Sequence, residues 1–380
     1  MSGWTPEQEA LRASARAFVE REIAPYLEQW EAEGLVPREL HRTAGRHGFL
    51  GVGFPEEAGG SGGDIRDVVA LTEAFIDAGA SSGLMAALFT HGIALPHIVS
   101  AGSPELIDRY VRPTLAGELI GSLAITEPSG GSDVARLRTR AVRDGDHYVV
   151  TGSKTFITSG TRADFLTTAV RTGGPGAAGL SLVVIDADSP GVTRSAPLAK
   201  TGWRCSDTAE LSFDAVRVPV GNLVGAENGG FALIAEHFVT ERLVLAVHAY
   251  SIAARCLELT VEQVRGRQTF GRPVITRQAV RHRLVDMARR TDVARTHTRD
   301  VVHAVGTGDV AVARALMAKA TAVEACLFVA DAAVQLHGGM GFMTGVEVER
   351  HARDARVLGI GGGTTEVLAD LTARLLGYTA

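Results

Sequence analysis

The sequence is poor in the residues that form covalent cross-links or metal sites. Its 380 residues include three cysteines, Cys205, Cys256 and Cys326, which are widely separated and odd in number. This pattern argues against a disulfide framework and a cysteine-based metal site, and it favours a reducing compartment. The twelve histidines show neither the H-E-x-x-H spacing nor a pairing with cysteines, so we expect no metal centre.

The sequence also lacks long basic runs and long uncharged apolar runs. The formal net charge is −5, and no basic run or stripe is present, so we expect no nucleic-acid partner. No uncharged apolar run reaches the roughly 18 residues that a membrane span requires. The N-terminal stretch MSGWTPEQEALRAS is polar and lacks the apolar segment of a secretory signal. We therefore expect a cytoplasmic protein without an integral membrane segment.

The hydrophobic period changes twice along the chain, which predicts three regions. Residues 1–118 have a helical pattern, beginning with Thr5 as N-cap and Pro6 at the first helical position. Residues 119–225 contain short segments rich in β-branched residues, such as HYVVTGSKTFIT and LSLVVID. Residues 226–380 return to long Ala/Val/Leu-rich helical patterns. The predicted fold class is α+β, with a helical domain, a middle β-domain and a second helical domain.

Two glycine-rich matches to known motifs lack the context that those motifs require. GGSGG (59–63) fits the G-x-S-x-G nucleophile elbow, but it follows PEEA instead of a strand. GIGGGT (359–364) lacks the last glycine of a dinucleotide fingerprint, and it leaves no room for a βαβ unit. Neither a hydrolase nor a Rossmann domain is therefore predicted.

Two segments of the middle region suit a flat polar ligand. In LAITEPSGGSDVARLRTRA (123–141), Thr126, Gly131 and Ser132 offer hydroxyls and unobstructed backbone N–H groups. A Gly/Ser-rich turn that only joins two elements is the alternative. In GSKTFITSG (152–160), Phe156 and Thr158 share one face of a strand, although ordinary strand packing explains this equally well.

Two segments of the last region suit phosphates or a close backbone approach. In RGRQTFGRPV (265–274), Arg267 and Thr269 precede a Phe-Gly turn, and arginine beside a hydroxyl can bind phosphate. A surface charge cluster is the alternative. The glycines of QLHGGMGF (335–342) allow a ligand to approach closely, or another helix to pack.

One carboxylate interrupts an apolar helical stripe. In FVTERLVLA (238–246), helical spacing places Glu241 in line with Ile234, Phe238 and Leu245. A carboxylate in such a position needs a partner or a function. It is either half of a structural ion pair, for example with Arg242, or a catalytic group.

In this order and spacing, the segments resemble the acyl-CoA dehydrogenase family of flavoproteins. The similar motifs are ITEPSGGSD, KTFITSG, KTGWRCSDTAEL, RQTFGRPV, QLHGGMGF and IGGGTTEV, which together span almost the whole chain. The resemblance implies an N-terminal helical domain, a middle β-barrel-like domain and a C-terminal four-helix bundle. It also implies FAD, an acyl-CoA or acyl-carrier-bound substrate, an electron-transfer flavoprotein as partner, and a homotetramer whose subunits complete each other's flavin sites.

The same resemblance implies the cofactor contacts, residue by residue. In the middle region they are Leu123, Ile125, Thr126, Gly131, Ser132, Phe156 and Thr158. Of these, Thr158 is expected near the reactive nitrogen of the flavin, and Ser132 is also expected to face the substrate. In the C-terminal region they are Arg267, Thr269, Phe270, Gln278, Gln335, Gly338, Gly339, Thr364 and Glu366. Of these, Arg267, Phe270, Gln278, Gln335, Gly338 and Gly339 are expected to hold the pyrophosphate and adenosine across a subunit interface.

The chemistry of the family requires a base that removes a proton from the α-carbon of an acyl thioester. Many members carry that base as the glutamate of an I-Y-E-G-T motif, where this sequence has Gly362. The segment TERLVLA resembles instead the isovaleryl-CoA and long-chain branches, whose base lies on the preceding helix. The resemblance therefore makes Glu241 the base, with a small residue opposite because two carboxylates would repel each other.

The remaining expectations concern the substrate. The implied substrate-binding residues are Ser132, Arg242, Gly361 and Gly362. The Gly362 N–H is expected to bond the thioester carbonyl, and desolvation is expected to raise the pKa of Glu241. Val239 stands where several short- and medium-chain members have an acidic residue near the pantetheine. The predicted reaction forms a trans-2-enoyl thioester; the alternatives are a flavin oxidase or monooxygenase, or a non-catalytic acyl-CoA-binding member.

Overall fold

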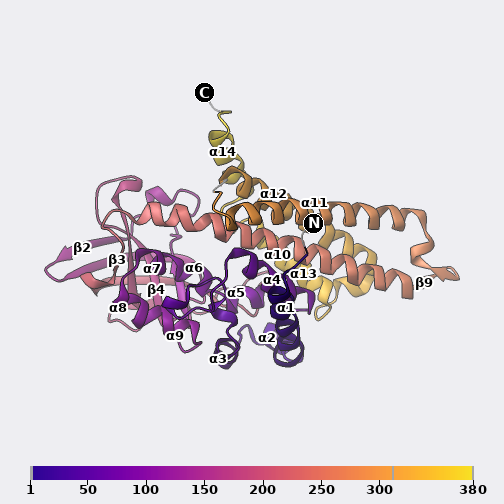
Figure 1. The fold of residues 1–380 in the computed structure, drawn as a ribbon, viewed down its shortest axis with the longest axis horizontal. Coiled ribbons are helices and arrows are strands. Elements are labelled where there is room, and N and C mark those ends of the chain that lie inside the picture. Colours follow the sequence, from indigo (N-terminus) through magenta and orange to yellow (C-terminus); the bar gives the residue numbers. More distant parts are fainter. Residues whose placement is uncertain (1–2, 310–311, 379–380) are drawn as a thin grey trace.

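The computed structural model describes residues 3–309 and 312–378, and its chain runs from helices through a sheet to long helices (Figure 1). Helix α1 begins as the sequence predicts, because the Thr5 hydroxyl accepts the Gln8 N–H and the Gln8 side chain accepts the Thr5 N–H. The N-terminal helices are α1 (Pro6–Phe18), α2 (Leu27–Glu33), α3 (Arg38–Arg46), α4 (Ile65–Asp77), α5 (Ser82–Leu88), α6 (His91–Ala94), α7 (Pro96–Ala101), α8 (Pro104–Leu106) and α9 (Arg112–Leu115).

The middle of the described chain forms an eight-stranded sheet. Its strands are β1 (Gly121–Ala124), β2 (Arg140–Asp144), β3 (His147–Thr158), β4 (Phe165–Arg171), β5 (Leu180–Asp186), β6 (Val192–Arg194), β7 (Thr208–Pro219) and β8 (Leu223–Val224). They follow the order β6-β7-β3-β2-β4-β5-β8, and β1 pairs in parallel with β4. Strands β3 and β7 pair with Val150 opposite Val216, and a register shift between Lys154 and Ile157 interrupts the ladder.

The C-terminal region consists mainly of long helices. They are α10 (Gly230–Gly266), α11 (Gln278–Gly306), α12 (Val312–His337), α13 (Glu347–Leu358) and α14 (Thr365–Leu375), with a small hairpin of β9 (Gln268–Thr269) and β10 (Arg272–Pro273) between α10 and α11. At 1.5 Å per residue, the 37 residues of α10 extend about 55 Å. The helix therefore reaches from beside the sheet to the hairpin at the other end of the molecule (Figure 1).

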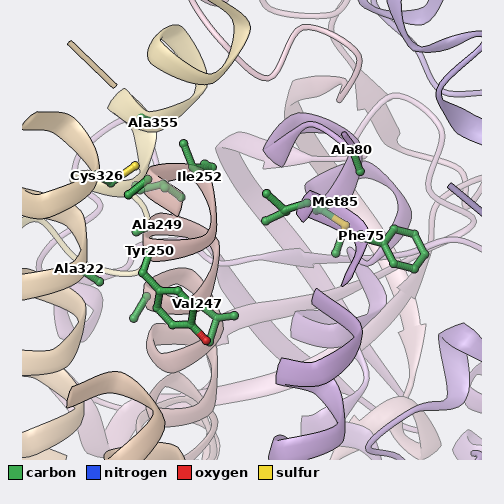
Figure 2. Packing of buried hydrophobic residues seen from close by; sticks show 14 of the residues in the cluster. Phe75, Ala80, Met85, Val247, Ala249, Tyr250, Ile252, Ala322, Cys326 and Ala355 are labelled. Carbon is green, nitrogen blue, oxygen red and sulfur yellow. The ribbon is translucent and has the colours of Figure 1, made fainter. Parts of the chain in front are cut away.

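The largest core lies around α10. Figure 2 shows Val247, Tyr250 and Ile252 of this helix between Met85 of the N-terminal helices and Cys326 of α12. Tyr250 also donates its hydroxyl proton to Glu73 of α4 over 2.6 Å. Because one helix contributes to both packing surfaces, it fixes the N-terminal helices relative to the C-terminal ones.

The architecture confirms the predicted α+β class, with helices, a sheet region and helices in that order. One helix comes close to membrane-spanning character, although its longest run without a charged residue is only 243–254. Helix α10 is long and apolar enough in one 18-residue window to cross a membrane. However, 56% of that window is buried inside the protein, as in the core helix of a globular domain.

The glycine loop before α4 has a structural role. The Ser61 hydroxyl donates to the Gly48 carbonyl over 2.8 Å, and Gly62 and Gly63 both adopt left-handed backbone angles. The loop follows the short turn at residues 56–58, whereas a nucleophile elbow follows a strand. The structure therefore agrees with the exclusion of a hydrolase-type serine site.

Candidate active site

Glu241 lies on the apolar face of α10, two turns after Ile234. Ile234 is buried, and Phe238 and Leu245 pack against the two hydrophobic clusters on either side of the helix. Desolvation in these surroundings raises the pKa of Glu241 to about 6, although the charges of Arg242 and Lys319 act in the opposite direction. A carboxylate with this pKa is ionised at neutral pH and is a stronger base than an exposed glutamate.

Arg242 does not neutralise its neighbour. Among the ion pairs of residues 3–309 and 312–378, none involves Glu241 within 4.0 Å. The Arg242 Nε–H donates instead to the Gly362 carbonyl over 3.0 Å, and the guanidinium lies 5.4 Å from the centre of the Phe238 ring. The ion-pair interpretation of Glu241 therefore has no support in the geometry, whereas Arg242 does hold the backbone opposite.

The turn between α13 and α14 brings Gly362 next to Glu241. Gly362 has φ of +65° and Gly363 has φ of +100°, angles that glycine adopts without strain. A Cβ atom built on Gly362 would lie 3.6 Å from Glu241 Oε1 and only 2.6 Å from Leu245 Cδ1. A longer side chain at position 362 would therefore enter the space next to the Glu241 carboxylate.

Sequence reasoning did not identify Lys319, the third group of this site. Lys319 is on α12, is 1% exposed, and donates from Nζ to the carbonyls of Gly361 and Gly363, the second over 2.7 Å. Burial lowers its pKa to about 8, against the opposing effect of Glu241. The available signal was the same as for Glu241, a single charge within an apolar run, here LMAKATAV (316–323).

A second cluster forms at the edge of the sheet. The Thr155 N–H donates to the Thr126 carbonyl over 2.9 Å, which joins β3 to the segment after β1. A Cβ atom on Gly131 would lie 3.1 Å from Thr126 Cγ2, so the glycine loop folds against the same threonine. Phe156 is 69% exposed with φ of +58°, which turns its ring out of the strand. The Thr158 carbonyl accepts the Ser122 hydroxyl over 2.5 Å, and Ser132 is exposed in the loop.

A buried ion pair beneath this cluster was also not predicted. Lys154 is 0% exposed, and its Nζ donates to Glu127 Oε1 over 3.0 Å and to the Ile125 carbonyl over 2.9 Å. Glu127 in turn accepts the N–H groups of Arg138 and Thr139. This ion pair fixes the segment that carries Leu123, Ile125 and Thr126. The sequence had grouped these three residues only through their shared motif.

A third cluster lies at the far end of α10. The Arg267 Nη1 donates to the His337 carbonyl over 3.2 Å, and a Cβ atom on Gly338 would come within 2.7 Å of that nitrogen. The Thr269 carbonyl accepts from Arg277, whose guanidinium lies 5.6 Å from the ring of Phe270. The structure thus brings Arg267 to the 335–342 segment, which is the end of α12 and the 3₁₀ helix after it and contains Gln335, Gly338 and Gly339. Phe270 is 96% exposed, and Gln278 is exposed at the start of α11.

Thr364 and Glu366 lie at the start of α14, directly after the glycine turn. The Thr364 hydroxyl accepts the Val367 N–H, and Glu366 is exposed in the first turn of this helix. The predicted site residues therefore form three clusters. Gly362, after α13, lies next to Glu241, Thr126 and Phe156 lie at the sheet, and the Arg267 cluster lies at the hairpin end of the molecule (Figure 1).

Family models match all three regions of the chain. The acyl-CoA dehydrogenase N-terminal domain matches residues 5–118, the middle domain residues 122–216 and the C-terminal domain residues 228–377. The chain belongs to the acyl-CoA dehydrogenase family. The resemblance inferred from the motifs is therefore confirmed, and with it an oxidoreductase that dehydrogenates acyl-CoA with flavin.

Individual members of the acyl-CoA dehydrogenase family align over nearly the whole chain. The long-chain specific acyl-CoA dehydrogenase of Rattus norvegicus is 36% identical over 98% of this chain and 86% of its own length. A crystal structure from Mycobacterium smegmatis, named as an acyl-CoA dehydrogenase, is 59% identical with a TM-score of 0.98, covering 99% of each chain. The acyl-CoA dehydrogenase structure from Geobacillus kaustophilus is 38% identical with a TM-score of 0.94, covering 98% of each chain.

The residues present fit the flavin cofactor of this acyl-CoA dehydrogenase family. The exposed aromatic ring of Phe156 suits a planar polar ring system, and it comes from the end of β3 that also carries Thr158 and that bonds to Thr126 through the Thr155 N–H. At the other end, Arg267 lies against Gly338, where the missing side chain leaves the guanidinium close to the backbone. Neither surface resembles the closed packing of the hydrophobic core, so both can accept a ligand.

Proposed function

We propose that the protein is an FAD-dependent acyl-CoA dehydrogenase that forms a trans-2-enoyl thioester, with Glu241 as the base. The observation that carries this proposal is the position of the Glu241 carboxylate. It stands beside Gly362 in apolar surroundings that raise its pKa to about 6, without an ion-pair partner among the described residues. A general base works best with a pKa near the operating pH, which burial achieves here.

The chain's own residues divide the proposed reaction between them. Glu241 takes the α-proton of the thioester onto its carboxylate. The Gly362 N–H has no hydrogen-bond partner among the described residues, so it is available to the thioester carbonyl, where negative charge develops. Arg242 holds the carbonyl of the same glycine. Bound FAD would accept the hydride from the β-carbon, completing the oxidation.

The distribution of the cofactor residues supports an assembly of several subunits. Thr126, Phe156 and Thr158 lie at the sheet, whereas Arg267 and the 335–342 segment lie at the other end of α10, which extends about 55 Å. One chain cannot bring both groups to the same dinucleotide over that distance. We therefore propose that a neighbouring subunit supplies the Arg267 group to each FAD, in a homotetramer. The exposed side chains of Phe270 and Phe342 at that end would then be covered by the neighbour.

The remaining parts of the proposal concern substrate, partner and location. We propose that an electron-transfer flavoprotein reoxidises the enzyme in the cytoplasm, and that residues 1–118, 119–225 and 226–380 form the three domains. Val239 is buried in the main hydrophobic core, so it adds no charge near the pantetheine. The lack of this charge is compatible with an acyl group carried by a protein instead of CoA, and the position of the base Glu241 on α10 favours medium, long or branched acyl chains.

A panel of acyl-CoAs tests the proposed function. The wild-type holoenzyme is mixed anaerobically with each thioester, and bleaching of the flavin absorbance is followed. Glu241→Gln should lower the bleaching rate about 10²–10⁴-fold, the usual contribution of a general base. Glu236→Gln, on an exposed part of the same helix, should bleach like wild type. An unchanged rate in Glu241→Gln would mean that another group is the base.

The same experiment separates the alternatives. An oxidase or monooxygenase would reoxidise rapidly when oxygen is admitted, whereas a dehydrogenase should stay reduced until an acceptor protein is added. A non-catalytic member would bind acyl-CoA without bleaching its flavin with any thioester of the panel.

A further inference from the structure

Lys319 is buried and forms no ion pair within 4.0 Å with a carboxylate of the described residues. The residue lies in the middle of α12, is 1% exposed, and is surrounded by buried Leu316, Ala322 and Val323 of its own helix. Within residues 3–309 and 312–378, its hydrogen bonds go only to backbone carbonyls, those of Gly361 and Gly363. Burying an ammonium group is expensive, so a fully buried lysine that binds only carbonyls requires an explanation beyond stability.

The carbonyls that Lys319 binds flank one particular peptide group. A trans peptide is planar, so the C=O of one residue and the N–H of the next point in opposite directions. By holding the Gly361 carbonyl toward α12, Lys319 turns the Gly362 N–H away from α12. Its second bond, to the Gly363 carbonyl, fixes the other end of the turn.

Without such bonds this turn would be poorly ordered. Gly361, Gly362 and Gly363 follow one another, and each glycine has more backbone freedom than any other residue. Arg242 of α10 holds the middle carbonyl, that of Gly362, over 3.0 Å. Two cations on two different helices thus bind three successive carbonyls and select one conformation of the turn.

We propose that Lys319 is a positioning residue, which holds the Gly361–Gly363 turn so that the Gly362 N–H can bind the thioester carbonyl of the substrate. This inference rests on the proposed function, because the substrate carbonyl belongs to that function. It goes beyond it by assigning to α12 a part in the reaction, although Lys319 touches neither the substrate nor the proton that is transferred.

The charge of Lys319 has a second effect on the same site. Two cations act on the Glu241 carboxylate, Arg242 of α10 and Lys319 of α12, while the glycine turn opposite contributes no titratable side chain. Both favour the ionised form of Glu241 and so limit the rise in pKa that burial causes. Loss of the Lys319 charge should therefore raise the pKa of Glu241 further.

Lys319→Met tests the proposal in the FAD-loaded enzyme, because methionine keeps the length and apolar stem but lacks N–H donors and charge. The first readout is the rate constant of anaerobic flavin reduction by an acyl-CoA that bleaches wild type. The second is the exchange of the substrate's α-proton with deuterium from solvent. We expect both rates to fall about 10–100-fold, less than complete removal of an oxyanion-binding donor would cause. The rising limb of the pH profile should move to higher pH, since Glu241 must lose its proton to act.

Lys200→Met is the matched control. Lys200 is partly buried, and its Nζ donates to the Ser206 carbonyl and, over 2.8 Å, to the Thr208 hydroxyl, away from the glycine turn. Its pH limb should coincide with that of wild type. The proposal would be overturned if Lys319→Met kept both the wild-type rate and the wild-type pH profile. It would also be overturned if Lys319→Met and Lys200→Met changed the rate and the pH profile equally.

Lys319→Gln serves as a second variant if the methionine variant folds poorly. Glutamine retains N–H donors without charge, so part of the rate should return while the pH limb stays displaced. A wild-type rate together with a wild-type limb would also overturn the proposal. Failure of the proposed function would look different, because the wild-type enzyme itself would then neither bleach nor exchange the α-proton.

Discussion

The molecule contains two buried lysines close to glutamates, with different results at the two sites. In the sheet region, Lys154 and Glu127 form a closed pair at 3.0 Å, and backbone N–H groups satisfy the rest of the carboxylate. Beside α10, Lys319 binds the carbonyls of the glycine turn, and no ion pair within 4.0 Å joins it to Glu241 among the described residues.

The pKa values of the two glutamates differ accordingly. Burial alone would raise the pKa of Glu127, but Lys154 and the N–H groups of Arg138 and Thr139 outweigh it, so the pKa is lowered. At Glu241 burial is the dominant effect, and the pKa rises to about 6. A direct contact between lysine and glutamate thus favours a structural carboxylate. A lysine held by carbonyls instead leaves the carboxylate free to accept a proton.

The largest difference between the two sites is expected when each lysine is removed in turn. Lys154→Met should lower the free energy of unfolding by about 3–5 kcal/mol, because it leaves the buried Glu127 charge without its partner. Lys319→Met should cost clearly less, because no closed ion pair is lost there. Chemical denaturation of both variants measures the difference, and equal losses would show that the two lysines are stabilised in the same way.

The second prediction concerns the pH dependence of stability at Glu241. Its pKa in the folded protein, about 6, is above the ordinary value of 4.5. The folded state therefore binds this proton more tightly than the unfolded state, and that contribution is lost as pH rises from 4.5 through 6. Above pH 7 the ionisation of buried Glu241 costs about 2 kcal/mol of stability. Glu241→Gln should therefore be more stable than wild type above pH 7, and the difference in stability should be smaller near pH 4.5.

Thermal unfolding of wild type and Glu241→Gln across this pH range measures the effect. The exposed Glu236→Gln variant controls for loss of a negative charge on the same helix. A difference between Glu241→Gln and wild type that does not change with pH would contradict the raised pKa.

The smallest effect is expected in the glycine turn itself. Gly362→Ala places a Cβ at φ of +65°, which costs about 1–2 kcal/mol, and brings it within 2.6 Å of the mobile end of Leu245. Gly359→Ala, three residues earlier, has φ of −80° and meets its nearest neighbour at an ordinary 3.5 Å. Denaturation curves should show a loss only for Gly362→Ala. Equal stability of the two variants would mean that the left-handed angle is not required.

The sequence made much of the fold predictable because local signals agreed with the final packing. Thr5 and Pro6 begin α1 as predicted, and the change from a helical to a β-branched pattern near residue 119 precedes β1 at Gly121. The stripe containing Glu241 was visible because helical spacing depends only on neighbouring residues. The placement of the domain boundaries and of the site residues stays a prediction.

The features that could not be predicted from the sequence depend on contacts between distant segments or on backbone atoms. Lys319 lies 78 residues after Glu241 in sequence and binds carbonyls, which carry no residue-specific signal. The pair of Lys154 with Glu127 depends on the alignment of β3 with the segment after β1, which residue patterns do not specify. The parallel pairing of β1 with β4 likewise joins segments about 40 residues apart.

The length of α10 has a consequence for how the protein would respond to dilution. If each cofactor needs the sheet end of one chain and the hairpin end of another, FAD links subunits as well as serving the reaction. Cofactor binding and assembly would then be one coupled equilibrium that obeys mass action. Diluting the protein would release flavin, and added FAD would restore both the assembly and the thermal stability.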